Sequence, residues 1–141
     1  MIWIALAQAP STPAILLSLA LVGTGLGAVW LEIGRKLRAL HVFFNPRTSW
    51  MSRESFAALA LFALGFGALA VPELAIGAAV AAAAFLYCQA RILRAAKGIP
   101  AWRAPVVVPL IVVTGLAEGA ALFAALQGNP IGLAVLAGGW W

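Results

Sequence analysis

Long apolar runs separated by short basic stretches set the pattern of this chain. Four of the runs have lengths that suit helices crossing a bilayer, at about 12–31, 55–71, 74–90 and 104–126. The first opens with Ser11-Thr12-Pro13, in which a capping residue precedes a proline in the first turn. A last apolar stretch, 131–141, has only about half the length needed to cross. The pattern predicts an all-α, polytopic membrane bundle of four transmembrane helices with a short C-terminal stub, in one domain covering residues 1–141.

The basic residues are confined to two stretches that flank apolar runs. The first stretch contains Arg35, Lys36, Arg38, Arg47 and Arg53, and the second contains Arg91, Arg94, Lys97 and Arg103. Two predicted helices separate the stretches, so both must lie on one side of the membrane, and the positive-inside rule predicts the cytoplasmic side. We expect these loops to meet anionic lipid headgroups or an acidic docking subunit, and no nucleic acid.

Composition excludes a water-soluble domain and narrows the cofactor chemistry. Apolar residues make up 65% of the chain, charged residues make up 9%, and the mean hydropathy is +1.05. A single cysteine, Cys88, leaves no partner for an internal disulfide and no Cys-only metal or iron–sulfur site. His41 is the only histidine, whereas a haem in a bundle usually needs two axial histidines from facing helices. We therefore expect no haem or metal in this chain.

Small residues recur at spacings that suit helix packing. They are Gly23 and Gly27, Gly65 beside Gly67, Gly77, and Gly115 with Gly119. Because small residues let helix backbones approach closely in a membrane, this pattern predicts a compact bundle. It carries no information about function.

Glu118 is an ionisable residue deep in the last predicted span. Thr114, Gly115 and Gly119 fall close to its face by helical spacing. A charge at that depth costs at least ~2.5 kcal/mol if it faces lipid, so the side chain should face the bundle interior or a wet cavity. A neutral glutamic acid in an interhelical hydrogen bond and a station in a proton relay both satisfy this requirement.

A second group of polar residues lies where the first two spans meet the basic loop. Glu32 ends the first span, Glu54 immediately precedes the second, and His41 lies between them. Stabilisation of Glu54 by the helix dipole, and neutralisation of both acids by nearby arginines, would account for them without chemistry. Alternatively, these groups suit a quinone, whose redox reaction moves two protons with two electrons and needs carboxylates or a histidine to exchange them. The remaining candidates for this quinone site are Trp50, Ser52 and Arg53.

Two segments resemble one family of membrane subunits. The run Glu32-Ile-Gly-Arg-Lys-Leu-Arg-Ala-Leu and the segment Thr48-Ser-Trp-Met-Ser-Arg-Glu54 resemble the anchor subunits of molybdopterin oxidoreductases, the DMSO-reductase anchor and NrfD-like polysulfide-reductase group. The later stretch 87–103 is most similar to anchors associated with phenylacetyl-CoA:acceptor oxidoreductase. The resemblance covers about residues 20–123.

The resemblance implies a haem-free bundle in the bacterial inner membrane. Such a subunit exchanges electrons and protons between the quinone pool, menaquinone or ubiquinone, and a docked iron–sulfur subunit that is bound to a molybdopterin catalytic subunit. The family's quinol-site glutamate falls on Glu54, the position of its histidine on Glu32, and the position of its proline on Lys36. The chain would then be a non-catalytic or quinone-reactive subunit of an oxidoreductase. The partner-facing arginines would be Arg35, Arg38, Arg47, Arg94 and Arg103.

Two other functions fit the same pattern. A small proton-coupled transporter would use Glu118 as its coupling acid, in a four-helix unit that must dimerise. A purely structural anchor or assembly subunit would need no chemistry. Substrate-dependent protonation of Glu118 distinguishes the first alternative, and neighbouring iron–sulfur and molybdopterin subunits favour the oxidoreductase anchor.

Overall fold

The described part of the chain is entirely helical. The computed structural model describes residues 1–6, 11–32, 41–96 and 98–128. These ranges contain no strand, which confirms the all-α prediction. The helices are α1 (Ile2–Leu6), α2 (Thr12–Glu32), α3 (Trp50–Gly67), α4 (Leu74–Ala95) and α5 (Val107–Leu126), with a 3₁₀ helix, η2 (Pro100–Arg103), before α5.

Three of these helices, α2, α4 and α5, are long and apolar enough to cross a membrane. Helix α3 differs because its N-terminal part carries Arg53 and Glu54. The apolar part of α3 that follows rises only roughly 20 Å at 1.5 Å per residue, less than the ~30 Å of a hydrocarbon core. The chain is thus an all-helical membrane protein with three candidate spans, and the fourth span stays a prediction.

Several predicted helix boundaries are corrected. Helix α3 begins at Trp50, not at 55, because the Ser49 hydroxyl accepts a hydrogen bond from the Ser52 backbone N–H (3.3 Å) and caps the helix there. Helix α4 continues past 90 to Ala95, so Arg91 and Arg94 belong to the helix. Helix α5 starts at Val107, after η2, and not at 104. The predicted stub at 131–141 lies outside the described residues.

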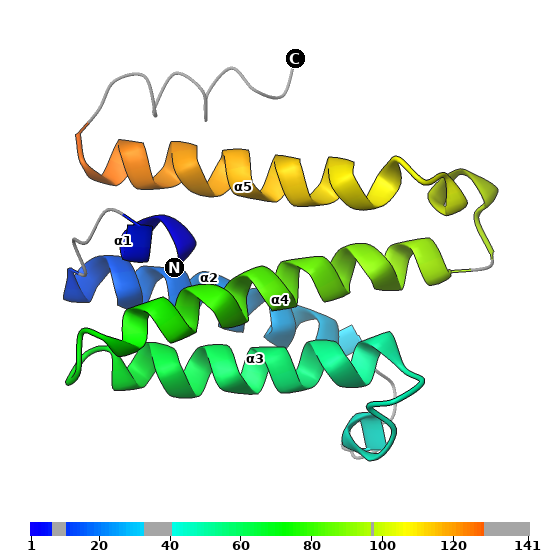
Figure 1. Cartoon of the computed structure of the whole chain (residues 1–141), viewed down its shortest axis with the longest axis horizontal. Helices are drawn as coiled ribbons and strands as arrows, with labels where there is room; N and C mark the ends of the chain where they lie inside the picture. Colours follow the sequence, from blue (N-terminus) through cyan, green and yellow to red (C-terminus); the bar gives the residue numbers. More distant parts are fainter. Residues whose placement is uncertain (7–10, 33–40, 97, 129–141) are drawn as a thin grey trace.

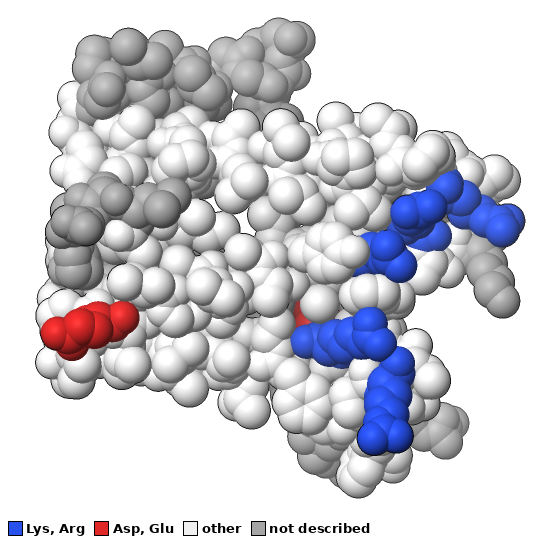
Figure 2. Space-filling model, viewed as in Figure 1, with Lys and Arg blue, Asp and Glu red and all other residues white. Residues whose placement is uncertain are grey.

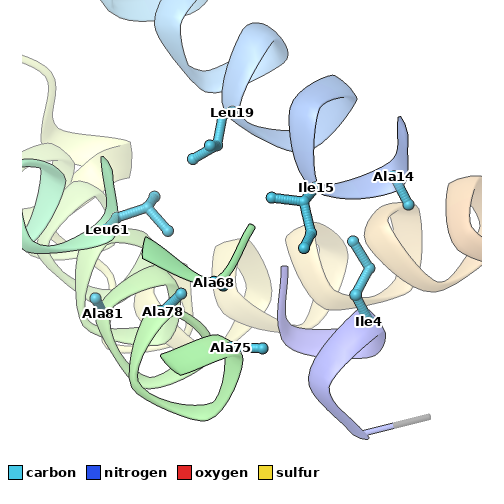
Figure 3. Packing of buried hydrophobic residues seen from close by; sticks show 9 residues of the cluster. All are labelled: Ile4, Ala14, Ile15, Leu19, Leu61, Ala68, Ala75, Ala78 and Ala81. Atoms are coloured by element: carbon cyan, nitrogen blue, oxygen red, sulfur yellow. The ribbon is translucent and has the colours of Figure 1, made fainter. Parts of the chain in front are cut away.

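The core lies near the turn that joins α3 to α4. These two helices pack against each other most extensively, and α4 lies between α3 and α5 (Figure 1). In Figure 3, Ile15 and Leu19 of α2 approach Leu61 and Ala68 from the α3 side and Ala78 of α4. Ile15 and Leu61 are each only 1% exposed. In contrast, α5 buries a single residue, Ala121, so its packing leaves much of its surface free for lipid or for other helices.

The short helix α1, which the sequence pattern did not predict, packs between α4 and α5 at this same end. Its Trp3 indole Nε1–H donates a hydrogen bond to the Leu116 carbonyl of α5 (3.0 Å). Gly119, one turn further along α5, leaves room for the indole, because a Cβ there would lie 3.4 Å from the Trp3 ring. Ile4 is 3% exposed and joins the core cluster. Helix α1 therefore fills the gap between α4 and α5 at the end opposite the basic residues.

The predicted role of small residues holds at some glycines and is wrong at one. A Cβ on Gly65 would lie 2.8 Å from Leu19 Cδ2 of α2, and one on Gly115 would lie 2.9 Å from Leu86 Cδ1 of α4. Both glycines therefore permit a close helix contact. Gly27 has no such neighbour within 4 Å.

Gly65→Leu should lower the thermal midpoint of the detergent-solubilised protein. The new side chain has to enter a contact that Leu19 already fills, and overpacking of this kind costs about 1–3 kcal/mol. Gly27→Leu is the matched control, because it makes the same chemical change where nothing lies within 4 Å. We expect the control to leave the midpoint unchanged or raise it, since leucine is the better helix former. Equal midpoints for the two variants would contradict the described α2–α3 packing.

The described basic residues gather at one end of the molecule, where α3 begins and α4 ends (Figure 2). This arrangement agrees with the prediction that both basic stretches lie on one side. Glu73 lies in the turn between α3 and α4, at the other end of that hairpin. Arg35, Lys36, Arg38 and Lys97 are outside the described residues. Which side of the membrane carries the basic end stays a prediction.

Candidate functional site

A cavity of about 1040 Å³ opens between α2, α4 and α5, and α3 contributes one residue to it. Helices α2 and α5 both border it while making almost no direct contact with each other. Its walls are mostly apolar. Their apolar and glycine residues are Leu21, Val22, Gly25, Leu26 and Val29 of α2, Phe85 of α4, and Val113, Gly115, Ala117, Gly119 and Leu122 of α5.

Four polar side chains line this cavity: Glu54, Gln89, Thr114 and Glu118. The fold therefore brings together the two carboxylates that the sequence placed in separate hypotheses, one at the membrane edge and one deep in the last span. Thr114 had been placed on the face of Glu118 by helical spacing. Gln89 was missed, although an amide within an otherwise apolar helical run was a usable signal. An apolar chamber with a few convergent polar groups is typical of a small-molecule site.

Glu54 has the environment of a group that exchanges protons. It lies in α3 before the apolar stretch of that helix and is half-buried. Burial raises the pKa of its carboxyl above the ordinary value, and a hydrogen bond with the Gln89 side chain partly opposes that rise. Because α3 begins at Trp50, Glu54 falls just beyond the first turn, where the helix dipole acts weakly. The dipole therefore gives a poor account of this acid.

Glu118 lies just past the middle of α5, and Thr114 lies one turn before it on the same face. Its side chain is exposed in the chain on its own and borders the cavity. This position agrees with the expectation that an acid at such depth faces a cavity. The cavity thus connects a carboxylate in the middle of a spanning helix with a carboxylate near the basic end.

Next to the cavity, Trp50 ties the two basic stretches together. The guanidinium carbons of Arg53 and Arg91 lie 4.4 Å and 4.5 Å from the centroid of its ring, within the range of cation–π attraction. Tyr87 meets the same ring edge-on, with centroids 6.0 Å apart. Arg53 also donates hydrogen bonds to the carbonyls of Pro46 (3.0 Å) and Arg47 (2.7 Å). These contacts fix the start of α3, and with it Glu54, against the end of α4.

The other predicted site residues lie outside the cavity lining. Glu32 is exposed at the end of α2. His41 is exposed in a 3₁₀ turn, and its ring lies 5.7 Å from that of Phe44. Ser52 is buried in the helix and 2% exposed. Of the predicted docking residues, Arg47, Arg94 and Arg103 are exposed and belong to the basic stretches, whereas Arg35 and Arg38 are not described.

Fold and cavity together define a helical membrane protein with an acid-lined internal chamber. Among curated proteins, the chain is similar to a membrane-complex component named as one of the subunits of sulfite dehydrogenase in Allochromatium vinosum. The two are 31% identical over 140 aligned positions, which cover 82% of this chain and 43% of the relative. The chain thus spans less than half the length of that relative. No protein-family model matches the chain, and no solved structure does.

Proposed function

We propose that this chain is a membrane subunit of a molybdopterin and iron–sulfur oxidoreductase, and that its cavity takes a quinone. The observation that carries the proposal is the joint lining of one apolar cavity by Glu54 and Glu118, with Gln89 and Thr114 beside them. A quinone is itself largely apolar but needs proton-exchanging groups at its oxygens. This chamber offers both properties.

The similarity to a sulfite dehydrogenase subunit supports a place in a redox complex. So does the resemblance of the segments ending at Glu54 to NrfD-like and DMSO-reductase anchors. In the proposed complex the basic end is covered by an iron–sulfur protein, which exchanges electrons with quinone in the cavity nearby. Exposed arginines at this end, Arg47, Arg94 and Arg103, would attract an acidic docking surface. The basic end would face the cytoplasm.

One alternative retains support from a specific observation. Glu118 borders a cavity in the middle of a spanning helix, as a proton-coupled transporter would require. The oxidoreductase subunit explains more of the cavity, since it also gives a role to Glu54 and Gln89 near the basic end.

The test of the proposed function is quinol oxidation by membranes of a strain that lacks the gene and is complemented with variant copies. An artificial electron acceptor replaces the unknown terminal substrate. Activity that depends on the gene and on Glu54 supports the proposal. Gene-independent quinol oxidation would contradict it.

A further inference from the structure

The polar side chains of the cavity form two levels along the bundle axis. Glu54 and Gln89 share a hydrogen bond and define an outer level, close to the basic end. Thr114 and Glu118, one turn apart on α5, define an inner level. No other titratable side chain lines this cavity within the described ranges.

The contacts between α4 and α5 give the offset between these levels. Gly115 touches Leu86, so these two residues lie at the same height on antiparallel helices. Gln89 is three residues outward from Leu86, and Glu118 is three residues inward from Gly115. At 1.5 Å per residue the inner level lies roughly 9 Å deeper than the outer one. Two hydrogen bonds of about 2.7 Å each account for a little over half of that offset and leave roughly the width of one six-membered ring.

The wall between the two levels suits such a ring. Phe85 lies one turn inward from Gln89 on the same face of α4, and its side chain lines the cavity between the levels. Opposite it, Gly115 and Ala117 keep the surface of α5 low. An aromatic side chain beside a shallow wall favours a flat ligand, which can stack on the phenyl ring.

We propose that the cavity holds one para-quinone headgroup lengthwise, with one oxygen at Glu54 and Gln89 and the other at Thr114 and Glu118. This inference rests on the proposed function and specifies the geometry of its substrate. On oxidation of a quinol, each O–H bond breaks and its proton passes to the carboxylate at that level. The two electrons leave to the iron–sulfur partner. Reduction of a quinone reverses every step, with both carboxylic acids returning their protons.

The arrangement predicts selectivity between quinone isomers, which equilibrium binding to the purified, detergent-solubilised protein can measure. 1,4-Naphthoquinone carries its oxygens at opposite ends of one ring and can reach both levels, whereas 1,2-naphthoquinone carries them on adjacent carbons and can reach only one. We expect the 1,4 isomer to bind about tenfold more tightly, the value of one hydrogen bond of ~1.4 kcal/mol.

Variants at the two ends of the bundle make the test specific. Glu118→Leu should remove the preference for the 1,4 isomer, and Glu118→Gln, which keeps hydrogen-bonding atoms, should keep part of it. Glu73→Leu changes a carboxylate in the α3–α4 turn, away from the cavity, and should leave the preference intact. Equal affinities in the unaltered protein, or an undiminished preference in Glu118→Leu, would overturn the two-level placement alone. Failure of both isomers to bind would overturn the proposed function as well.

Discussion

Glu54→Gln should lower quinol oxidation by about a hundredfold while the amount of protein in the membrane stays the same. The amide keeps the size of the side chain and a hydrogen bond to Gln89, but it cannot take up a proton. Positioned acids and bases contribute about 10²- to 10⁴-fold to such reactions, so we expect the lower part of that range in a cavity that water can enter.

Two variants provide controls for this result. Glu73→Gln makes the same change in the turn between α3 and α4 and should oxidise quinol normally. Glu32→Gln should have a smaller effect than Glu54→Gln, because Glu32 is exposed at the end of α2 and does not line the cavity. Normal turnover in Glu54→Gln, with normal protein levels on an immunoblot, would show that this carboxylate takes no part in the chemistry.

Glu118→Gln should lower quinol oxidation about tenfold and leave the protein assembled. Its position in the middle of α5 makes a neutral replacement acceptable to the bundle, since no charge has to be stabilised there. Water in the cavity can carry part of the proton traffic at the inner level, so we expect a smaller effect than at Glu54. Steady-state rates in complemented membranes, normalised to protein level, give the comparison.

The same variant separates the oxidoreductase subunit from the transporter. A transporter that couples transport to one acid would lose all proton-coupled activity in Glu118→Gln and would show no dependence of quinol oxidation on this residue. An unchanged quinol rate together with loss of proton-coupled uptake would therefore favour the transporter and contradict the proposed function.

Helix content was readable from the sequence because apolar runs of spanning length leave few other structures open to a chain in lipid. Charge at the start of α3 hid its true boundary. Arg53 and Glu54 suggested a loop, whereas Ser49 caps a helix that already includes both residues. Helix α1 was not predictable, since five residues carry too little periodicity and its position depends on contacts with α5 such as the one from Trp3.

The candidate site was only partly predictable. Spacing along one helix placed Thr114 beside Glu118, because those residues are neighbours in sequence and on one face. Joining Glu118 to Glu54 required the relative heights of α3, α4 and α5, which depend on tertiary contacts such as Gly115 with Leu86. Local sequence could suggest a polar cluster around His41 and Glu32. It could not show that these exposed residues lie away from the cavity.

The most direct test of the central claim is photolabelling of the membrane protein with an azido-quinone, followed by peptide mapping. Occupation of the cavity predicts adducts on the cavity-lining part of α5, residues 113–122, and on α4 around Gln89. An excess of unlabelled ubiquinone or menaquinone should suppress these adducts. Adducts confined to other surfaces, or adducts at these positions that excess quinone does not suppress, would contradict a quinone site in this cavity.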